Sequence, residues 1–301
     1  MNNNINIINR INRLKKTQDI CILAHVYQNP EIQDIADYTG DSLALSKIAE
    51  KNESNIIVFC GVSFMAETAH ILNPNKTVLL PKKTAGCDLA DMASVDDLKK
   101  MEQQHPKAKI VCYINSTAEI KAASDICCTS ANAVSIVESL DCDEVIFIPD
   151  KNLGSYVAEQ SNKNIILSDG FCYVHENIQP ETIKSLNQDH PNAEVIVHPE
   201  CNKAVRDLAD CVGGTARMTA YIKESSCEEF IVGTEDNFIH HLKKNCPDKS
   251  YYPVNTQCYG MRTITLPDVL TSIEQNKTKI TIPASVRTKA YKTIQAMMKK
   301  S

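Results

Sequence analysis

Three cysteines recur at nearly equal spacing in this sequence of 301 residues, and their number points to a particular metal chemistry. Cys87, Cys172 and Cys258 are separated by 85 and 86 residues. Three thiolates are one too few to close a tetrahedral structural metal site. They suit a [4Fe–4S] cluster with three cysteine ligands and one open iron, which can act as a Lewis acid toward a substrate oxygen or nitrogen. A zinc site and three inert buried cysteines remain the alternatives.

Three sets of polar residues recur with the same period, after apolar runs that end near residues 25, 113 and 198. The first set stands at the run ends and two positions beyond them: His25, Tyr27, Tyr113, Asn115, His198 and Glu200. The second set follows twelve positions after the run ends: Asp37, Asp125 and Asp210. The third set lies five positions further on: Ser42, Ser130 and Thr215. Singly each is more often a structural hydrogen-bonding residue, but in register they predict one site assembled from three copies.

Each set suggests its own chemistry. The hydroxyl residues precede amphipathic stretches, so they are predicted at helix N-cap positions, where they cap the helix or present hydroxyl and N–H groups to a phosphate or carboxylate. The aspartates are predicted to tie down turns. Glu200 is the best general-base candidate, with His198, Tyr27 and Tyr113 able to donate or move protons. His175, three residues after Cys172, either contacts substrate or orients a group that does.

The strands and helices that must position these residues are predicted to follow a repeated α/β pattern. Further apolar runs, "NIIVFCG", "DEVIFIP" and "EEFIVGT", are followed by helix-like stretches and by third runs, "KTVLLP", "KNIILS" and "KSYYPV". Such alternation predicts βαβ units with parallel sheets. We therefore predict an α/β fold of three αβα domains related by a pseudo-threefold axis, with short parallel sheets around a central active site. The expected units span residues 1–88, 89–173 and 174–275, with 276–301 packing back on the first.

Because open α/β sheets bind ligands outside the carboxyl ends of their strands, the strand-end residues of all three units are expected to face the central cavity. "DDLKKMEQQHP", "ETIKSLNQDHP" and "PDVLTSIEQN" predict helical linkers after the three units. The first sixteen residues are either an amphipathic targeting segment or a surface helix, and their helical spacing favours the helix.

Composition excludes several classes of protein. The net charge of −5 and the lack of a long basic run argue against nucleic-acid or membrane-surface binding, and no apolar stretch is long enough to cross a bilayer. The 13 cysteines include no Cys-x-x-Cys pair, which argues against zinc-ribbon or bacterial ferredoxin spacing. Several stand inside apolar runs, which is typical of reduced thiols, so we expect a cytoplasmic protein.

Several long motifs carry a resemblance to a known family. "AHVYQNPEIQDIADYTGDSLALSKIA", "GCDLADM", "YINSTAEIKAASDICCTSANA", "GFCYVHE" and "VHPECNKAVRDLADCVGGT" resemble the A-type quinolinate synthases of NAD biosynthesis, in order over roughly residues 20–290. The resemblance implies three pseudo-symmetric domains around a [4Fe–4S] cluster held by Cys87, Cys172 and Cys258. It also implies substrate and catalytic roles for His25, Tyr27, Ser42, Tyr113, Asn115, Ser130, His175, His198, Glu200 and Thr215.

The resemblance further implies a reaction. The family condenses iminoaspartate with dihydroxyacetone phosphate to quinolinate, phosphate and water, and its functional partner is an L-aspartate oxidase or dehydrogenase that makes iminoaspartate. Two positions depart from the family pattern: Val26 replaces a tyrosine, and Gly214 replaces a serine. Val26 is expected on the opposite face from the site, whereas the hydroxyl lost at Gly214 is worth about 1 kcal/mol.

Three other functions remain open at this point. An iron–sulfur hydro-lyase acting on another hydroxy acid would use the same open iron. An iron–sulfur redox or iron sensor would use a cluster only for signalling, and it would not need the converging His, Tyr and Glu side chains. A sugar-phosphate-binding protein without a metal would not need the three cysteines.

Overall fold

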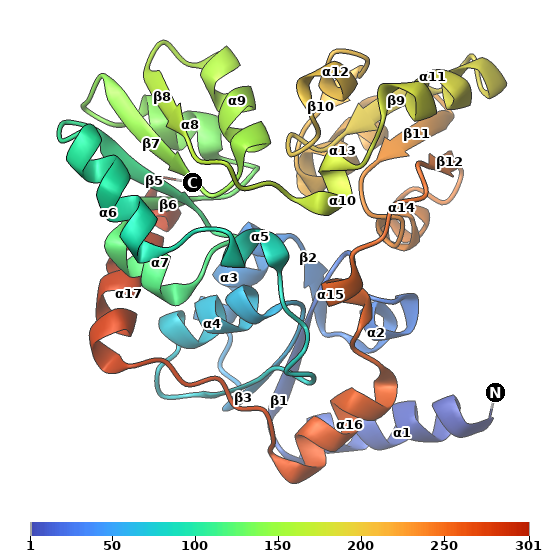
Figure 1. The fold of residues 1–301 in the computed structure, drawn as a ribbon. Coiled ribbons are helices and arrows are strands. Elements are labelled where there is room, and N and C mark those ends of the chain that lie inside the picture. The colour runs from blue at the N-terminus through green and yellow to red at the C-terminus, as the bar shows by residue number, and fades with distance from the viewer. Residues whose placement is uncertain (1, 301) are drawn as a thin grey trace.

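The computed structural model describes residues 2–300 and contains three α/β units (Figure 1). The first unit has α1 (Asn2–Thr17), β1 (Ile20–His25), α2 (Pro30–Ile35), β2 (Tyr38–Gly40), α3 (Ser42–Lys51), β3 (Ile56–Cys60), α4 (Ser63–Leu72), β4 (Thr77–Leu79) and α5 (Asp88–Asp91). The second has α6 (Val95–Gln104), β5 (Lys109–Tyr113), α7 (Ala118–Ala123), β6 (Ile126–Cys128), α8 (Ala133–Glu138), β7 (Glu144–Ile148), α9 (Lys151–Gln160), β8 (Asn164–Leu167) and α10 (Tyr173–Glu176). The third has α11 (Pro180–Asp189), β9 (Glu194–Val197), α12 (Lys203–Arg206), β10 (Cys211–Val212), α13 (Thr215–Glu224), β11 (Glu229–Gly233), α14 (Phe238–Asn245), β12 (Ser250–Pro253) and α15 (Tyr259–Arg262). Helices α16 (Leu266–Gln275) and α17 (Ala284–Lys299) follow.

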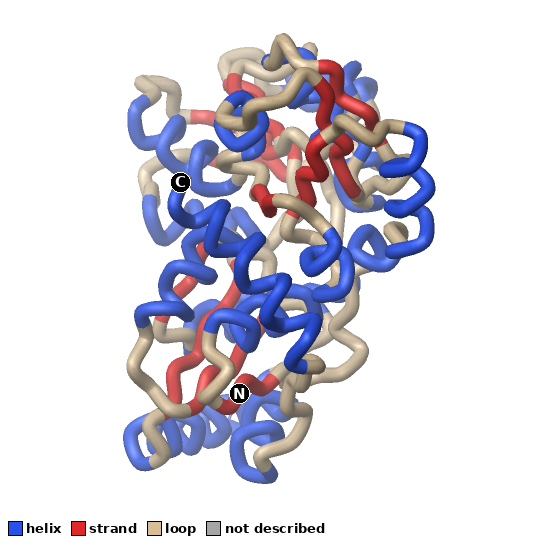
Figure 2. The backbone as a smooth tube through the Cα atoms, turned by 90° about the vertical axis from the view of Figure 1, so that its left-hand side faces the viewer, coloured by secondary structure: helices blue, strands red, loops and turns tan. Residues whose placement is uncertain are grey.

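Each unit contains one four-stranded parallel sheet, and the three sheets have the same strand order. The orders are β2-β1-β3-β4, β6-β5-β7-β8 and β10-β9-β11-β12. The central strands, such as β3, are almost wholly buried because helices cover both faces of each sheet, which Figure 2 shows as strands enclosed by helices. The predicted α/β fold of three units with short parallel sheets is confirmed.

The strand order determines where a ligand site can form. In each sheet the first strand lies between the second and third, so the chain changes direction across the sheet at that strand. Such a switch point, at the carboxyl end of a parallel strand, is where open α/β sheets bind ligands. The strands concerned are β1, β5 and β9, and His25 and Tyr113 are the last residues of the first two.

The three aspartates of the second repeated set hold equivalent turns. A carboxylate oxygen of Asp37 accepts a hydrogen bond from the backbone N–H of Ile22 at 2.8 Å. Asp125 accepts from the N–H of Ile110, and Asp210 from that of Val195, each also at 2.8 Å. The prediction that these aspartates tie down turns is confirmed, and the matching distances show that the repeat extends to the backbone.

Residues 278–299 link two units. Residues 278–280 pair with the edge strand β4, with Leu80 N–H donating to Thr278 O and Ile280 N–H to Val78 O. This pairing covers an edge that would otherwise expose backbone groups. Helix α17 then packs against α7 and β6 of the second unit and, on one side, against α4 (Figure 1). The sequence-based expectation placed residues 276–301 back on the first unit. The pairing of 278–280 with β4 lies on that unit, whereas the apolar face of α17, with Ile294 and Met297 buried, faces mainly the second.

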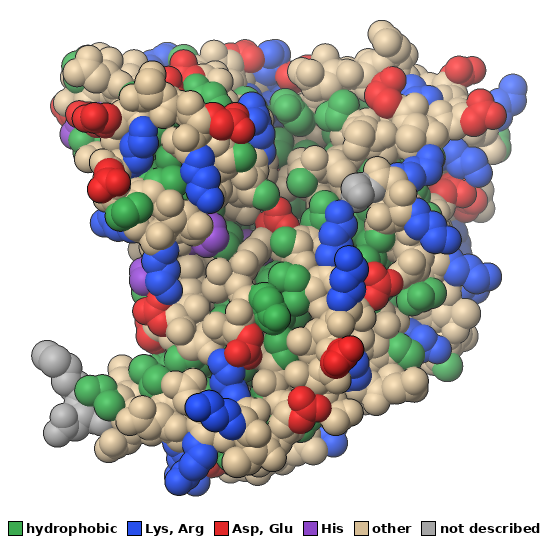
Figure 3. Space-filling view, turned by 180° about the vertical axis from the view of Figure 1, so that it is seen from behind, with side chains coloured by type: hydrophobic (Ala, Val, Ile, Leu, Met, Phe, Trp, Pro, Cys, Tyr) green, Lys and Arg blue, Asp and Glu red, His purple; other side chains and the backbone are tan. Residues whose placement is uncertain are grey.

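The N-terminal segment is the predicted helix, and α1 packs against α16 and β1 through Ile11, which is fully buried. On the face shown in Figure 3, basic and acidic side chains are interspersed over the surface. Among residues 2–300, no helix combines the length and apolar character that a bilayer span requires.

Candidate active site

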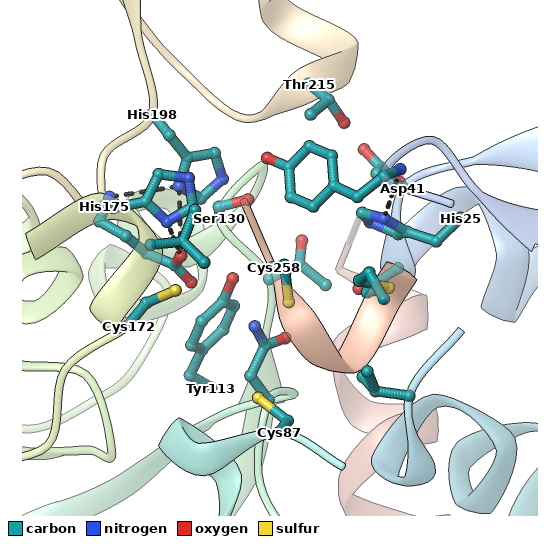
Figure 4. A pocket seen from close by; sticks show the side chains of 18 of the residues that line it. His25, Asp41, Cys87, Tyr113, Ser130, Cys172, His175, His198, Thr215 and Cys258 are labelled. Carbon is teal, nitrogen blue, oxygen red and sulfur yellow. Dashed lines mark hydrogen bonds and ion pairs between the residues drawn. The ribbon is translucent and has the colours of Figure 1, made fainter. Parts of the chain in front are cut away.

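The residues selected from the sequence come together in one cavity between the three units. The empty space between them, including the part that is open to solvent, is about 680 Å³. Every predicted site residue contributes to its lining: His25, Tyr27, Ser42, Cys87, Tyr113, Asn115, Ser130, Cys172, His175, His198, Glu200, Thr215 and Cys258. Figure 4 shows the cysteine sulfurs and Tyr113 on one side of this space and Thr215 on the other.

The three cysteines occupy the same structural position in their units. Cys87, Cys172 and Cys258 each immediately precede a short helix, α5, α10 or α15, and each has an extended backbone conformation. Their sulfurs point toward a common space (Figure 4). Burial raises the pKa of all three thiols, and for Cys87 and Cys172 the neighbouring thiols raise it further. Three thiols that oppose one another's ionisation in this way favour a bound cation, which stabilises thiolates.

Two buried carboxylates hold the backbone at these cysteines. Asp150 accepts a hydrogen bond from the Cys172 N–H at 3.1 Å, and Glu235 accepts one from the Cys258 N–H at 3.3 Å. Burial raises the pKa of Glu235 to about 7, although Arg262, whose Nε lies 2.5 Å from the carboxylate, works in the opposite direction. These contacts fix the loops that carry the thiols.

The histidines at the ends of β1 and β9 are neutral hydrogen-bond donors. The Tyr27 N–H donates to His25 Nδ1 at 3.2 Å, and the Glu200 N–H donates to His198 Nδ1 at 3.3 Å. Because Nδ1 is the acceptor in both rings, the ring proton is on Nε2. Burial lowers the pKa of His25 and of His198 to about 3, so both are neutral at pH 7.

Glu200 is a buried carboxylate placed between two imidazoles. Its Oε2 lies 2.6 Å from His175 Nδ1 and 3.5 Å from His198 Nδ1, and the two rings stack with centroids 4.4 Å apart. Burial alone would raise the pKa of Glu200, but His198 and His175 outweigh it and hold the pKa below its usual range. The carboxylate is therefore ionised and able to accept a proton.

Several polar atoms around Glu200 are left for a ligand. Glu200 Oε1 and Asn115 Oδ1 are buried and have no hydrogen-bond partner within residues 2–300. The Cys172 sulfur and the ligand atoms of His175 and Glu200 all lie within 4.8 Å of one another. Buried polar atoms without partners are rare in folded proteins, so this grouping indicates a site for a ligand or metal.

The three hydroxyl residues are not helix caps, and this prediction is wrong. Ser42 and Thr215 are the first residues inside α3 and α13, and the caps are Asp41, whose carboxylate accepts from the Ala44 N–H, and Gly214. Ser130 lies in the turn before α8, which is capped by Asn132. The structure places these hydroxyls one residue into the helix or in the preceding turn, so capping does not consume them.

Comparison with known proteins identifies the family. Residues 9–299 match the model of the family described as "Quinolinate synthetase A protein". This chain belongs to the quinolinate synthetase A family. It is 49% identical over 298 residues to a quinolinate synthase of Clostridium perfringens, a match that covers 98% of this chain and 99% of that relative. Proteins named quinolinate synthase 1 from Methanosarcina acetivorans and quinolinate synthase from Dehalococcoides mccartyi are each 48% identical, with at least 97% of both chains covered.

Sequence reasoning did not find every residue that lines the cavity. Asp41 and Thr129 also line the cavity, and so do four apolar residues: Val62, Phe64, Val174 and Met261. These apolar side chains lower the local dielectric of the cavity, which the periodic polar pattern could not reveal. Asp41 directly precedes Ser42 in the "TGDS" turn, so the turn itself was the available signal.

The two departures from the family pattern have different surroundings. Val26 is buried and is not among the cavity residues, in agreement with its expected position on the opposite face. Gly214 approaches Ser130 closely, and a Cβ atom at position 214 would lie 2.7 Å from the Ser130 Oγ. The space that a serine side chain would need is thus partly occupied by the hydroxyl of Ser130.

Proposed function

We propose that this chain is a quinolinate synthase that condenses iminoaspartate with dihydroxyacetone phosphate to give quinolinate, phosphate and water. The observation that carries the proposal is the shared cavity, in which three thiols face an ionised Glu200 and a set of hydroxyl and imidazole donors. Membership of the quinolinate synthetase A family supports the same reaction. The enzyme would then act in NAD biosynthesis.

The donor set fits a [4Fe–4S] cluster. Cys87, Cys172 and Cys258 would provide three thiolate ligands, and within residues 2–300 no fourth cysteine lines the cavity. When bound, such a cluster supplies an iron without a protein ligand, which polarises a substrate oxygen or nitrogen. The apolar side chains of Val62, Phe64, Val174 and Met261 would exclude water from it.

The opposite side of the cavity would bind the anionic groups of the substrates. Ser42 and Thr215 stand in the first turns of α3 and α13, where side-chain hydroxyls and free backbone N–H groups point outward. The Nε2–H groups of His25 and His198 add neutral donors. These hydrogen-bond donors are numerous enough for the two carboxylates of iminoaspartate and the phosphate of dihydroxyacetone phosphate. Ser130 and Asn115 add further polar groups to the cavity lining.

Glu200 would act as the general base. Ring formation and loss of water require protons to leave carbon and to reach a departing oxygen. An ionised carboxylate is the form that accepts a proton, and His198 and His175 keep Glu200 in that form by holding its pKa below the usual range. Burial raises the pKa of Tyr27 and Tyr113, so both phenols stay protonated and can donate hydrogen bonds to the departing oxygen.

The reaction also implies a partner. Iminoaspartate is an imine that hydrolyses in water, so it has to be made close to the time of its use. We propose an L-aspartate oxidase or dehydrogenase as the functional partner of this enzyme.

The test is an anaerobic assay of protein with a reconstituted cluster. Dihydroxyacetone phosphate and freshly generated iminoaspartate are supplied, and quinolinate is measured by liquid chromatography with mass detection. We expect quinolinate from the wild-type protein and none from Cys87→Ser, whose iron content should fall. Absence of product from wild-type protein with a full complement of iron and sulfide would refute the proposed function.

A further inference from the structure

The three cysteines line a second pocket in addition to the cavity. We call it the outer pocket, and its lining also includes Gly86, Asp88, Tyr173 and Tyr259, which stand next to the cysteines in the sequence. Asp88 and Tyr259 are exposed to solvent, so this pocket opens at the surface of the molecule. Figure 1 shows the helices that follow the cysteines, α5, α10 and α15, together around the centre of the view.

The cysteines separate the outer pocket from the buried groups of the cavity. Cys87, Cys172 and Cys258 are partly exposed. By contrast, His175 and Glu200 are each 2% exposed, although their ligand atoms lie within 4.8 Å of the Cys172 sulfur. The three cysteines thus face solvent on one side and border the buried imidazole and carboxylate on the other.

The cavity meets a different surface pocket on its far side. That pocket shares Asp41 and Thr215 with the cavity and is also lined by Lys223. Figure 4 places Thr215 across the cavity from the cysteine sulfurs. Apart from the thiols, Asp88 is the one ionisable side chain with a full charge at pH 7 among the described residues of the outer pocket. A lysine near the proposed anion-binding hydroxyls suits anionic substrates, whereas a carboxylate beside thiols suits a metal cation.

The order in which an entering metal ion meets its ligands differs between the two sides. From the Thr215 side, an iron ion has to pass through the cavity, where Glu200 and His175 can bind it together with Cys172. From the outer pocket it meets the three thiols first, with Asp88 beside them. Because iron–sulfur clusters require thiolate ligands, entry from the outside avoids capture of iron by the carboxylate and the imidazole.

Two tyrosines cover part of the outer pocket. The rings of Tyr173 and Tyr259 stack with centroids 6.1 Å apart and an interplanar angle of 16°. The Tyr259 N–H donates to the Tyr173 hydroxyl at 2.8 Å, and that hydroxyl also forms a hydrogen bond with the Cys258 thiol. Tyr259 is 76% exposed, so moving its ring away from Tyr173 would lose little buried surface.

We propose that the outer pocket is the entrance through which iron reaches Cys87, Cys172 and Cys258, and that the Tyr259 ring limits the rate of this passage. The inference rests on the proposed function, because it concerns the cluster of that enzyme. Assembly and repair of the metal site then do not use the space in which the substrates bind. Asp88 attracts the iron cation toward the thiols, and Tyr259 slows the escape of iron from them.

The first test measures the release of iron from protein with a reconstituted cluster. Iron is captured anaerobically by the chelator ferrozine in the presence of dithionite. Tyr259→Ala widens the outer pocket and should speed release about 3- to 10-fold, whereas Thr84→Trp narrows it from another lining position and should slow release by a similar factor. Ala220→Trp narrows the pocket on the Thr215 side and is the matched control, with release expected at the wild-type rate. A wild-type rate in either outer-pocket variant, or slower release from Ala220→Trp, would overturn the proposal.

Labelling by N-ethylmaleimide tests the same entrance on the full chain before the cluster is reconstituted. The initial rate at each cysteine is measured by mass spectrometry. At the three cysteines of the site, Tyr259→Ala should be labelled faster than wild type, and Thr84→Trp more slowly. Cys142 and Cys227 are partly exposed and lie outside both pockets, so their rates should be the same in all three proteins and report an intact fold. Any other order at the site, with these two rates unchanged, would contradict the proposal.

Asp88→Asn separates the effect of charge from that of size. Iron uptake during reconstitution should slow about two- to threefold at low salt and less at high salt, because the cation loses an attractive charge near the entrance. N-ethylmaleimide is uncharged and should label the three cysteines at the wild-type rate. Wild-type iron uptake by Asp88→Asn at low salt would refute the outer pocket as the entrance for iron. Failure of quinolinate synthesis in wild type would refute only the proposed function, because none of these measurements needs turnover.

Discussion

The first and third units build the same backbone turn around different side chains. In the first, the end of β1 gives His25 and Tyr27; in the third, the end of β9 gives His198 and Glu200. In both turns the backbone N–H two residues after the histidine donates to its Nδ1, at 3.2 and 3.3 Å. The repeated scaffold thus fixes the histidine in the same neutral form, and the position two residues later is the one that varies.

The residue two positions after the histidine, Tyr27 in the first unit and Glu200 in the third, gives the two units groups of different chemistry. Burial raises the pKa of Tyr27, which remains a phenol and a hydrogen-bond donor or acceptor. The imidazoles of His198 and His175 outweigh burial at Glu200 and lower its pKa, so it remains a carboxylate and a base. Under the proposed function, this single position of a repeated turn would separate an acid role from a base role, as pairs of groups in different environments do in many enzymes.

The sharpest test of this comparison is removal of each group. Glu200→Gln keeps the size of the side chain but removes the base, and we expect kcat to fall by about 10²–10⁴-fold. Tyr27→Phe removes one hydroxyl and should cost about 10- to 100-fold. Both are measured as quinolinate formation under anaerobic conditions with iron content as the control. Equal losses in the two variants would show that the units do not divide the work as described.

Acid should destabilise the two turns in the same way. Each histidine has a folded-state pKa of about 3 against an ordinary value of 6.5, so between these values the unfolded chain binds more protons than the folded one. Stability is therefore full above about pH 6.5 and falls as the pH drops toward 3, by up to about 1.4 kcal/mol per histidine per pH unit.

This pH dependence is checked by urea unfolding between pH 7 and pH 5, with His25→Asn and His198→Asn as variants that lack the titrating group. Burial also lowers the pKa of His70 and His241, so wild type alone does not isolate the two turns. Each variant should lose less stability than wild type over this range. A variant with the full wild-type slope would mean that its histidine is already protonated in the folded state.

The sequence was sufficient to predict the repeat and the cavity because both depend on local, periodic signals. Apolar runs such as "NIIVFCG" predict a buried parallel strand. A polar residue that follows such a strand in an open sheet lies at the carboxyl edge, where ligands bind. The three cysteines, Glu200 and the strand-end histidines follow from that argument. Their roles remain proposals, because position alone does not define chemistry.

Other features have no comparable local signal. The two-residue strand β10 is too short to show a period, and the capping of α3 by Asp41 rather than Ser42 depends on a shift of one residue. Helix α17 could not be assigned to the second unit, because its apolar face fits any partner equally well by pattern. The buried hydroxyl of Thr234 also has no signal in the repeat, because its contacts with Tyr27 and His175 join residues that are far apart in the sequence.

The hydrogen bonds that the repeated aspartates accept from backbone N–H groups test whether the first and third units depend equally on the shared backbone turn. Asp37→Ala and Asp210→Ala each leave a backbone N–H, of Ile22 or Val195, without its acceptor, and each should lower the free energy of unfolding by about 1–3 kcal/mol. Asp37 also forms an ion pair with Lys15 at 2.8 Å, so its loss should be the larger by up to about 1 kcal/mol. Urea unfolding measures both values. A neutral Asp210→Ala would show that the third unit does not depend on the repeated tie.

The smallest expected effect concerns the start of the helix that follows each turn, where the first unit has Asp41 and the third has Gly214. Any side chain at position 214 must displace the Ser130 hydroxyl, because a Cβ there would approach its Oγ to 2.7 Å. Gly214→Ala imposes this displacement and adds no hydrogen bond, so we expect KM to rise by up to about fivefold, or about 1 kcal/mol. Gly214→Ser imposes the same displacement but adds a hydroxyl, and its KM should lie below that of Gly214→Ala. If the Gly214→Ser enzyme instead binds substrate less tightly than the Gly214→Ala enzyme, the Ser130 hydroxyl already occupies the place of a serine hydroxyl at position 214. The second unit then provides the contact that the third unit lacks.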